Sequence, residues 1–201
     1  MKNNRVENAE NIIRENGGVA TSALLHANGI DNRLIEKLVA SGTIDRVQRG
    51  VFQLADVGDS NDQFVLACSI VPSGVVALLS ALEYHQFTTF MAREINLAIP
   101  RSAWAPKLPV YPPMKLTFFS NSAYSLGITT LNHNGGCIRI YDPEKTVCDI
   151  FRYRHKLGQD IALEAIKEYM RRKPRSVQKL MEYAKILRID KKIRPFLEAL
   201  V

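Results

Sequence analysis

The sequence predicts an α+β protein, with an N-terminal winged helix-turn-helix and a larger mixed α/β C-terminal domain that ends in several helices. Three observations indicate this class. Residues 5–40 contain three short helical patterns broken by glycine turns, and a two-strand pattern follows them. Residues 94–141 contain four short strand patterns. Residues 71–87 and the residues after 141 have mainly helical periodicity.

The first helices are predicted from apolar spacing and from residues that start or stop a helix. Apolar residues recur on one face from Arg5 to Asn16, where a Gly-Gly pair ends the pattern. Thr21 or Ser22 is placed to cap a second helix over residues 23–27. Asp31 can cap a third helix. The apolar face of this third helix is Leu34, Ile35 and Leu38.

The stretch TIDRVQRGVF, residues 43–52, predicts a hairpin whose turn includes Gly50, because a tight turn favours a residue that tolerates positive φ. In a winged helix-turn-helix, the helix after the glycine turn and this hairpin contact DNA. Arg33 suits guanine and Asn32 suits adenine, since each can make two hydrogen bonds to one base edge. The predicted DNA contacts are Asn32, Arg33, Glu36, Lys37, Arg46, Gln48, Arg49 and Gly50.

An alternative for the same helix is a solvated face, on which Arg33 and Lys37 pair with Glu36 or Asp31 at helical spacing. For Arg49, the alternative is a solvated arginine on a loop.

Polar residues at 57–63 indicate a linker between a DNA-binding domain at residues 1–56 and a second domain at residues 64–201. In the second domain, residues 71–87 predict a buried helix with Ser73 as its cap. Four strands are expected, with a hairpin loop between the last two, at residues 94–99, 115–119, 127–131 and 137–141.

The stretch YDPEKTVCDIFRY predicts a helix from Pro143 to about His155. Asp142 can cap it, proline suits its first position, and Glu144 favours the positive end of its dipole. Further helices are predicted over residues 159–172, 176–187 and 191–200.

The formal charge of +7 lies in the last quarter of the chain. Residues 1–56 carry 7 Lys and Arg against 7 Asp and Glu, whereas residues 151–201 carry 14 against 6. A basic surface attracts nucleic-acid phosphates, and it also attracts acidic proteins. The candidate phosphate or partner contacts are Arg171, Arg172, Lys173, Arg175 and Lys179, with a plain solvated basic face as the alternative.

A nuclease or transferase is the competing class, because Asp142, Glu144 and Lys145 lie close together after a strand. A metal-dependent nuclease needs carboxylates that converge from neighbouring strands, and these residues are better used at a helix start. His85 is expected to form a hydrogen bond at the end of a helix. We therefore assign no catalytic residue, no metal ligand and no cofactor. Thr146, Asp149 and Arg152 are either a functional polar face or a solvated one.

The three cysteines, Cys68, Cys137 and Cys148, are widely spaced in apolar surroundings and are expected to be buried, reduced thiols. No apolar run approaches the roughly 20 residues of a membrane span, and the N-terminus lacks an apolar signal core. A cytoplasmic location without membrane contact is therefore expected.

Two regions together resemble AbiEi-type antitoxins. GVATSALLHANGIDNRLIEKLVASGTIDRVQRGVFQLA resembles the winged helix of that family, while SALEYHQFTT and IRIYDPEKTVCDIFRYRHKLGQDIALEAI resemble its second domain. The resemblance covers nearly the entire chain. It implies an antitoxin of a bacterial type IV toxin-antitoxin or abortive-infection system, which acts in phage defence. Such a protein represses its own operon at double-stranded operator DNA, often at inverted repeats. It also counters a nucleotidyltransferase toxin, generally without a stable complex.

The alternative is a winged-helix regulator whose second domain senses a ligand or mediates oligomerisation, with no toxin involved. The neighbouring gene separates the two hypotheses, because the antitoxin requires a nucleotidyltransferase beside it.

Overall fold

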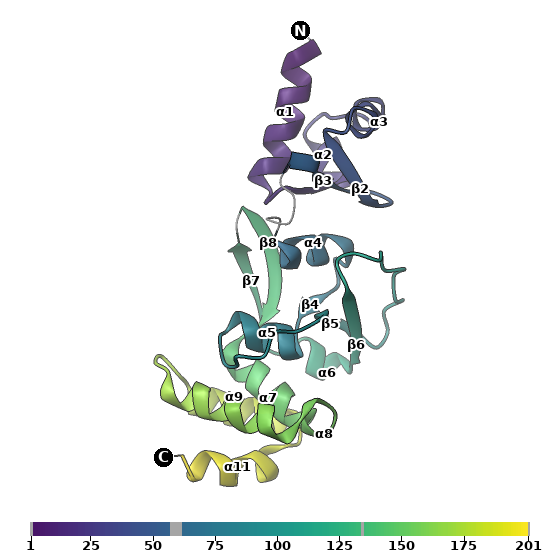
Figure 1. Cartoon of the computed structure of the whole chain (residues 1–201). Coiled ribbons are helices and arrows are strands. Elements are labelled where there is room, and N and C mark those ends of the chain that lie inside the picture. Colours follow the sequence, from purple (N-terminus) through teal and green to yellow (C-terminus); the bar gives the residue numbers. More distant parts are fainter. Residues whose placement is uncertain (1, 57–61, 134, 201) are drawn as a thin grey trace. The chain divides into compact units, whose positions relative to one another are not determined.

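The computed structural model describes residues 2–56, 62–133 and 135–200, and it shows a mixed α+β protein with two β-sheets (Figure 1). The chain divides into two compact units. Unit 1 comprises Met1–Pro72, Pro106–Met114 and Thr130–Ile138. Unit 2 comprises Ser73–Ala105, Lys115–Thr129 and Arg139–Val201.

Unit 1 begins with three helices and a three-stranded antiparallel sheet of order β1-β3-β2. Thr21, not Ser22, caps α2, because its hydroxyl accepts a hydrogen bond from the Leu24 amide at 3.2 Å. Asp31 caps α3 by accepting from the Leu34 amide at 2.9 Å. The elements are α1 (Lys2–Glu15), β1 (Val19–Thr21), α2 (Ser22–Ala27), α3 (Asn32–Ala40), β2 (Ile44–Gln48) and β3 (Val51–Leu54).

These elements enclose one apolar cluster, as the sequence periodicity predicts. Its fully buried members include Ile13 of α1, Leu25 of α2 and Leu38 of α3. Leu34 is only partly buried. The strand β1 was not predicted, because three residues are too few to show an alternating pattern. Its Val19 and Ala20 are fully buried, so burial and pairing with β3 determine it.

Unit 1 also contains α4 (Gln63–Ile70), which Asp62 caps through bonds from the amides of Phe64 and Val65. Most of the predicted linker, residues 57–61, lies outside the described residues. The predicted domain boundary therefore stays a prediction. The compact units group residues 64–70 with the N-terminal helices, whereas the sequence interpretation places them in the second domain.

The second sheet has five strands in the order β6-β5-β4-β8-β7. The strand β4 pairs with β5 antiparallel and with β8 parallel. The four strands predicted from the sequence are confirmed, with shifts of one or two residues at their ends. The five strands are β4 (Val75–Val76), β5 (Ile95–Pro100), β6 (Met114–Phe119), β7 (Ile128–His133) and β8 (Gly136–Tyr141).

The helix predicted over residues 71–87 with Ser73 as its cap is wrong in its first half. This stretch contains β4, and α5 (Leu78–Tyr84) starts only after Ala77, with no side-chain cap. The apolar run around Val75 and Val76 forms a buried strand. A short apolar run in a sequence does not by itself distinguish a buried strand from a buried helix. A short helix, α6 (Asn121–Tyr124), was also not predicted.

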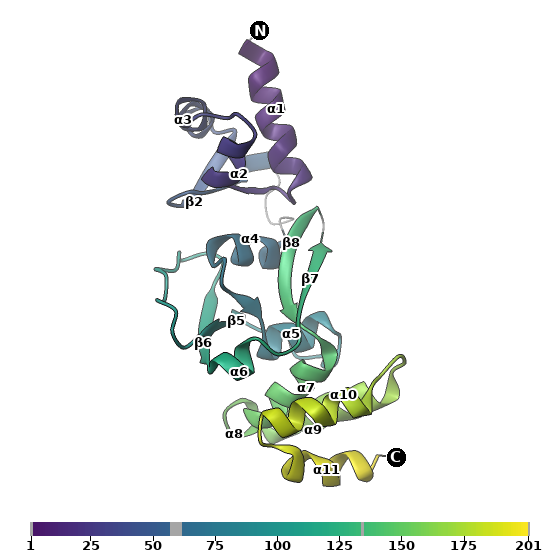
Figure 2. The same ribbon diagram turned by 180° about the vertical axis from the view of Figure 1, so that it is seen from behind.

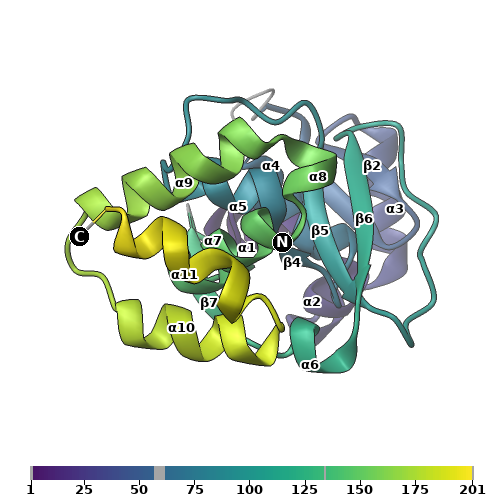
Figure 3. The same cartoon turned by 90° about the horizontal axis from the view of Figure 1, so that it is seen from below.

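The C-terminal helices follow the predicted order. Asp142 caps α7 and Pro143 occupies its first position, as predicted, while the helix ends at Arg152 and a short helix continues after it. In unit 2, α11 lies between α9 and α10 (Figure 3). The helices are α7 (Pro143–Arg152), α8 (Arg154–Leu157), α9 (Gln159–Arg171), α10 (Val177–Ile186) and α11 (Asp190–Glu198).

The cysteine prediction holds only for Cys148, which is buried; burial also raises the pKa of its thiol. Cys68, on α4, is half-buried. Cys137 is exposed, because the side chains of β8 alternate between the two faces of the sheet. Within the described residues, none of the three cysteines forms a disulfide. Within the described residues, every helix is too short or too polar to span a membrane.

Candidate nucleic-acid interface

The helix α3 presents the side chains that the sequence assigns to DNA. Ile35 and Leu38 are 2% and 1% exposed, so the opposite face of the helix is turned to solvent. α3 and β2 lie next to each other in both Figure 1 and Figure 2. The exposed residues of α3 include Asn32, Arg33, Glu36 and Lys37.

Ion pairing divides the cations of the N-terminal segment into two groups. Three arginines are paired with carboxylates: Arg5 with Asp31 at 3.0 Å, Arg14 with Asp56 at 2.7 Å, and Arg46 with Glu36 at 2.5 Å. The other three cations whose side chains are described in residues 5–56 have no carboxylate partner among the described residues. They are Arg33, Lys37 and Arg49.

This division tests the alternative in which Arg33 and Lys37 pair with Asp31 or Glu36. That pairing is not formed, because Asp31 and Glu36 have other arginine partners. Both free cations border a hollow of about 630 Å³ between α1 and α3. The neutral charge count of residues 1–56 therefore conceals a local excess of positive charge on α3.

Arg46 is held against the protein. Its guanidinium pairs with Glu36 of α3 and lies over the Phe52 ring, 5.4 Å from the centroid. This arrangement fastens β2 to α3, although an exposed pair of this kind contributes only about 0–1 kcal/mol. Arg46 and Glu36 thus have a structural role that the sequence interpretation did not assign to them.

The turn of the hairpin consists of Arg49 and Gly50. Gly50 has φ +80°, and its carbonyl accepts a hydrogen bond from the Ser22 amide at 2.9 Å. A Cβ at this position would lie 3.4 Å from the Ser22 hydroxyl. Gly50 therefore holds the turn against the start of α2 and leaves the exposed Arg49 at its tip.

Arg49 shares a groove of about 400 Å³ with a second cation, Lys107. The groove lies within unit 1, and Leu108 and Pro109 form part of its wall. The sequence interpretation missed Lys107, because it lies far from the hairpin in the chain and no local pattern marks it. The fold brings two positive side chains to one edge of unit 1.

Two of the predicted DNA contacts have partners within the protein. The Gln48 Nε2 atom donates to the Ile70 carbonyl at 3.3 Å. The Asn32 Oδ1 atom lies 2.8 Å from His26 Nε2. Of the eight predicted contacts, Arg33, Lys37 and Arg49 are the charged side chains without a carboxylate partner in the described part of the chain.

The predicted basic contacts near the C-terminus fall into similar groups. Arg172 donates to the carbonyls of His85 and Gln86 and lies over the Phe87 ring, and Lys179 pairs with Asp142 and Glu144. Arg171 pairs with Glu168 on its own helix. The remaining two, Lys173 and Arg175, are exposed and have no carboxylate partner among the described residues.

Unit 2 contains a buried charged cluster that the sequence interpretation also missed. Lys145 and Asp149 of α7 are both fully buried and form an ion pair. The Lys145 ammonium lies 4.0 Å from the centroid of the Tyr141 ring and 4.8 Å from that of Phe119. In the described residues, the Asp149 Oδ1 atom has no hydrogen-bond partner. The helical apolar pattern gives no signal of this pair, because both residues are ordinarily exposed.

The carboxylates at the start of α7 contact polar side chains of α9 and α10. Lys179 Nζ lies 3.0 Å from Asp142 Oδ2 and 3.3 Å from Glu144 Oε2. The hydroxyl groups of Tyr183 and Tyr169 donate to Asp142 and Glu144, each at 3.0 Å. Burial alone would lower the pKa of Lys179, but the bond to Asp142 and the two negative charges outweigh it and raise that pKa.

These contacts give the DPEKT sequence a packing role. Asp142 caps the helix through Oδ1, as predicted, and its other oxygen contacts α10. Thr146 and Asp149 are buried, so the solvated alternative is wrong for both, while Arg152 is exposed. Among the described residues, no cluster of three acidic, cysteine or histidine side chains has metal-binding geometry.

His85 occupies the helix end that the sequence assigned to it. It follows α5 as its C-cap, and its ring Nε2 lies 2.7 Å from the Tyr141 carbonyl, to which it donates. Burial lowers the pKa of His85, which favours the neutral ring.

No protein-family model matches the chain, and no curated protein matches it. Among solved structures, the chain is similar to the crystal structure of the RV2827C protein from Mycobacterium tuberculosis. The TM-score is 0.58 at 14% sequence identity, and the match covers 94% of this chain and 79% of that chain. At this identity the likeness shows a common fold and nothing about activity.

Proposed function

We propose that the protein is a sequence-specific DNA-binding repressor in which residues 1–56 act as a winged helix-turn-helix. In this proposal α3 is the recognition helix and enters the major groove, while the β2–β3 hairpin is the wing. The order of α1, α2, the turn at Gly29, α3 and the hairpin supports this assignment.

One observation carries the proposal. The cations of the N-terminal segment that have no carboxylate partner in the described residues, Arg33, Lys37 and Arg49, lie on α3 and at the hairpin tip. DNA binding depends on cations that can replace the counterions of phosphates, and a cation already paired contributes less. We assign Arg33 to a base or phosphate contact, and Arg49 with Lys107 to the DNA backbone beside the wing.

We further propose that this repressor is an AbiEi-type antitoxin that regulates its own operon and counters a nucleotidyltransferase toxin. The support is the sequence resemblance over both halves of the chain, including the DPEKT helix start and the hairpin with Arg49 and Gly50. The protein needs no enzymatic activity for this role.

A gel-shift titration on the DNA upstream of the protein's own gene tests the repressor. Arg33→Ala and Arg49→Ala are each expected to weaken binding about tenfold or more, because a lost charged contact costs roughly 1.5–3 kcal/mol. Arg14→Ala is the matched control, since Arg14 is exposed but paired with Asp56 away from α3. Binding by both variants at the wild-type level would contradict the assigned contacts.

Co-expression tests the antitoxin. If a nucleotidyltransferase encoded beside this gene arrests growth when expressed alone, expression of this protein is expected to restore growth. Restoration by the Arg33→Ala variant as well would place the antitoxic activity outside the DNA contacts. A neighbouring gene of another kind, or continued arrest, would favour the ligand-sensing alternative.

A further inference from the structure

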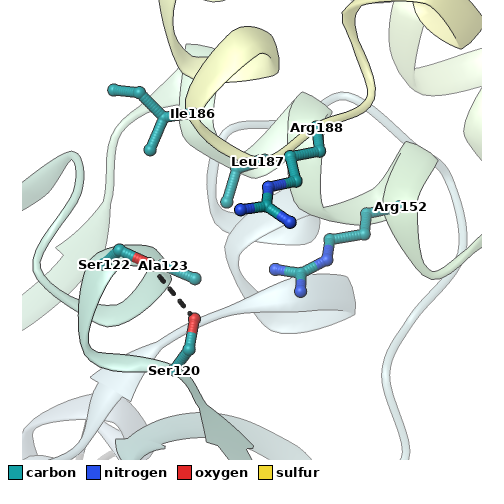
Figure 4. A pocket seen from close by; sticks show the side chains of 7 residues that line it. All are labelled: Ser120, Ser122, Ala123, Arg152, Ile186, Leu187 and Arg188. Carbon is teal, nitrogen blue, oxygen red and sulfur yellow. Dashed lines mark hydrogen bonds between the residues drawn. The ribbon is translucent and has the colours of Figure 1, made fainter.

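A pocket of about 310 Å³ lies in unit 2 beside the C-terminal end of α10 (Figure 4). Arg152 from α7 and Arg188, which follows α10, line one side of it. Ser120 and Ser122 line another, and Ile186 and Leu187 contribute an apolar wall. Its volume is at the lower end of the range for small-molecule sites, roughly 300–1,000 Å³.

The two arginines bring their positive charges together. Figure 4 shows both guanidinium groups pointing into the same space, with the serine hydroxyls facing them. In the described part of the chain, neither guanidinium has a hydrogen-bond or carboxylate partner; Arg152 contacts only a ring, that of Tyr153, at 5.9 Å. Asp149 interacts with Arg152 at longer range, but neither exposed guanidinium is ion-paired in the described residues, so an anion between the two groups would reduce their repulsion.

The backbone at Arg188 gives a second, independent observation. Arg188 has φ +58°, a left-handed conformation that glycine or asparagine usually occupies after a helix. Its amide donates to the Lys185 carbonyl at 3.0 Å, and the Ile189 amide donates to the Ala184 carbonyl. These two bonds terminate α10. An arginine here is less favourable for the backbone than glycine, and a strained residue at a pocket is a reason to infer a role for its side chain.

We propose that this pocket binds the terminal phosphate of a small phosphate monoester. Arginine matches phosphate because its planar group donates two parallel hydrogen bonds, and two arginines match the double negative charge of a monoester. Ser120 and Ser122 donate to the remaining oxygens, and the hydroxyls already lie 3.4 Å apart. The pocket exceeds the size of phosphate alone, so the organic part packs on Ile186 and Leu187.

This inference is independent of the DNA contacts in unit 1. If the second domain senses a ligand, this pocket is the site where that ligand would bind. A nucleic-acid backbone offers the same phosphoryl chemistry, but an internal diester carries one negative charge and is extended on both sides. The two ligands therefore differ in charge, and only the monoester has its phosphate at the end of the molecule.

Calorimetric titration of the full-length protein tests the proposal with three probes: inorganic phosphate, glycerol 3-phosphate, and a thymidine oligonucleotide without terminal phosphate. The first two are expected to bind saturably. Arg152→Gln and Arg188→Gly are each expected to weaken that binding roughly 10- to 100-fold. Lys185→Ala is the control, because it removes a neighbouring exposed charge of α10 that does not line the pocket.

Arg188→Gly separates binding from folding, because glycine suits the left-handed backbone and the melting temperature is expected to stay or rise. Loss of phosphate binding with an unchanged melting temperature supports the site. The proposal is overturned if neither phosphate probe binds saturably, or if the arginine variants bind like Lys185→Ala. It is also overturned if the oligonucleotide binds as tightly as glycerol 3-phosphate and loses affinity in the same two variants.

Discussion

The buried ion pair of Lys145 and Asp149 bears directly on the stability of unit 2. Moving an ammonium and a carboxylate out of water is costly, and their attraction offsets that cost only while both are present. The rings of Tyr141 and Phe119 add a cation–π contact to Lys145. Each partner therefore stabilises the protein chiefly because the other is buried beside it.

Lys145→Met is expected to lower the free energy of unfolding by about 3–5 kcal/mol, because it leaves the Asp149 carboxylate buried and uncompensated. Urea denaturation measures this change. Lys185→Met, at an exposed site on α10, is the control and is expected to stay within about 0.5 kcal/mol of wild type. The double variant Lys145→Met with Asp149→Leu is expected to recover part of the loss. A single variant as stable as wild type would contradict the role of the pair.

The burial of His85 is expected to make the stability of the folded protein depend on pH. Since burial lowers its pKa in the folded state below the ordinary 6.5, the unfolded chain binds more protons as the pH falls through that value. The stabilisation is therefore present above pH 6.5 and is lost as the pH falls towards the folded pKa. Nearby charged side chains also affect the pKa of His85. Asp142 and Glu144 favour the charged ring and raise this pKa, while Arg172 lowers it.

Urea denaturation at pH 7.5 and pH 5.5 checks the sign. The wild-type free energy of unfolding is expected to fall between these values, and to fall less in His85→Gln, whose amide can still donate to the Tyr141 carbonyl. His155→Gln, at an exposed position, is the control and is expected to keep the wild-type slope. Equal slopes in all three proteins would exclude His85 as the source.

At the scale of elements, local chemistry made two helix starts predictable from the sequence. Asp31 and Asp142 each cap the helix that follows, because a cap depends only on the residues next to it. By contrast, β1 and β4 were missed, since each is defined by a strand distant in the chain. The salt bridges of Lys179 were missed for the same reason, because Asp142 and Glu144 lie on another helix.

Lys179 and Lys173 are expected to behave in opposite ways, although both belong to the predicted basic set. Lys179→Gln removes the cation that fastens α10 to the start of α7, so the free energy of unfolding is expected to fall by about 1 kcal/mol; the loss is moderate because this side chain is 42% exposed. Lys173→Gln removes an exposed cation and is expected to leave stability unchanged. If the C-terminal helices touch phosphate, DNA affinity is expected to fall in Lys173→Gln and to stay unchanged in Lys179→Gln. The reverse pattern would show that Lys179 contacts DNA.

For the whole molecule, the charge count alone does not show which cations are available to contact DNA. The excess of 14 Lys and Arg over 6 Asp and Glu in residues 151–201 directs attention to the C-terminal helices. There, Arg171, Arg172 and Lys179 have partners inside the protein, whereas Arg33, Lys37 and Arg49 in the neutral segment have no carboxylate partner within the described residues. The sequence shows which cations exist, but pairing in the fold determines which of them remain available.

The salt dependence of operator binding separates these two groups of cations. Each phosphate contact contributes roughly 0.9 to the slope of log K against log salt concentration, so Arg33→Gln, Lys37→Gln and Arg49→Gln together are expected to lower the slope by as much as about 2.7. Lys173→Gln with Arg175→Gln is expected to lower it by as much as about 1.8 if the C-terminal helices also touch phosphate. Full-length variants are needed, because unit 1 includes residues well beyond position 60 and a truncated fragment would lack part of it. A slope that only the second set of variants lowers would move the DNA contacts from α3 and the hairpin to the C-terminal helices.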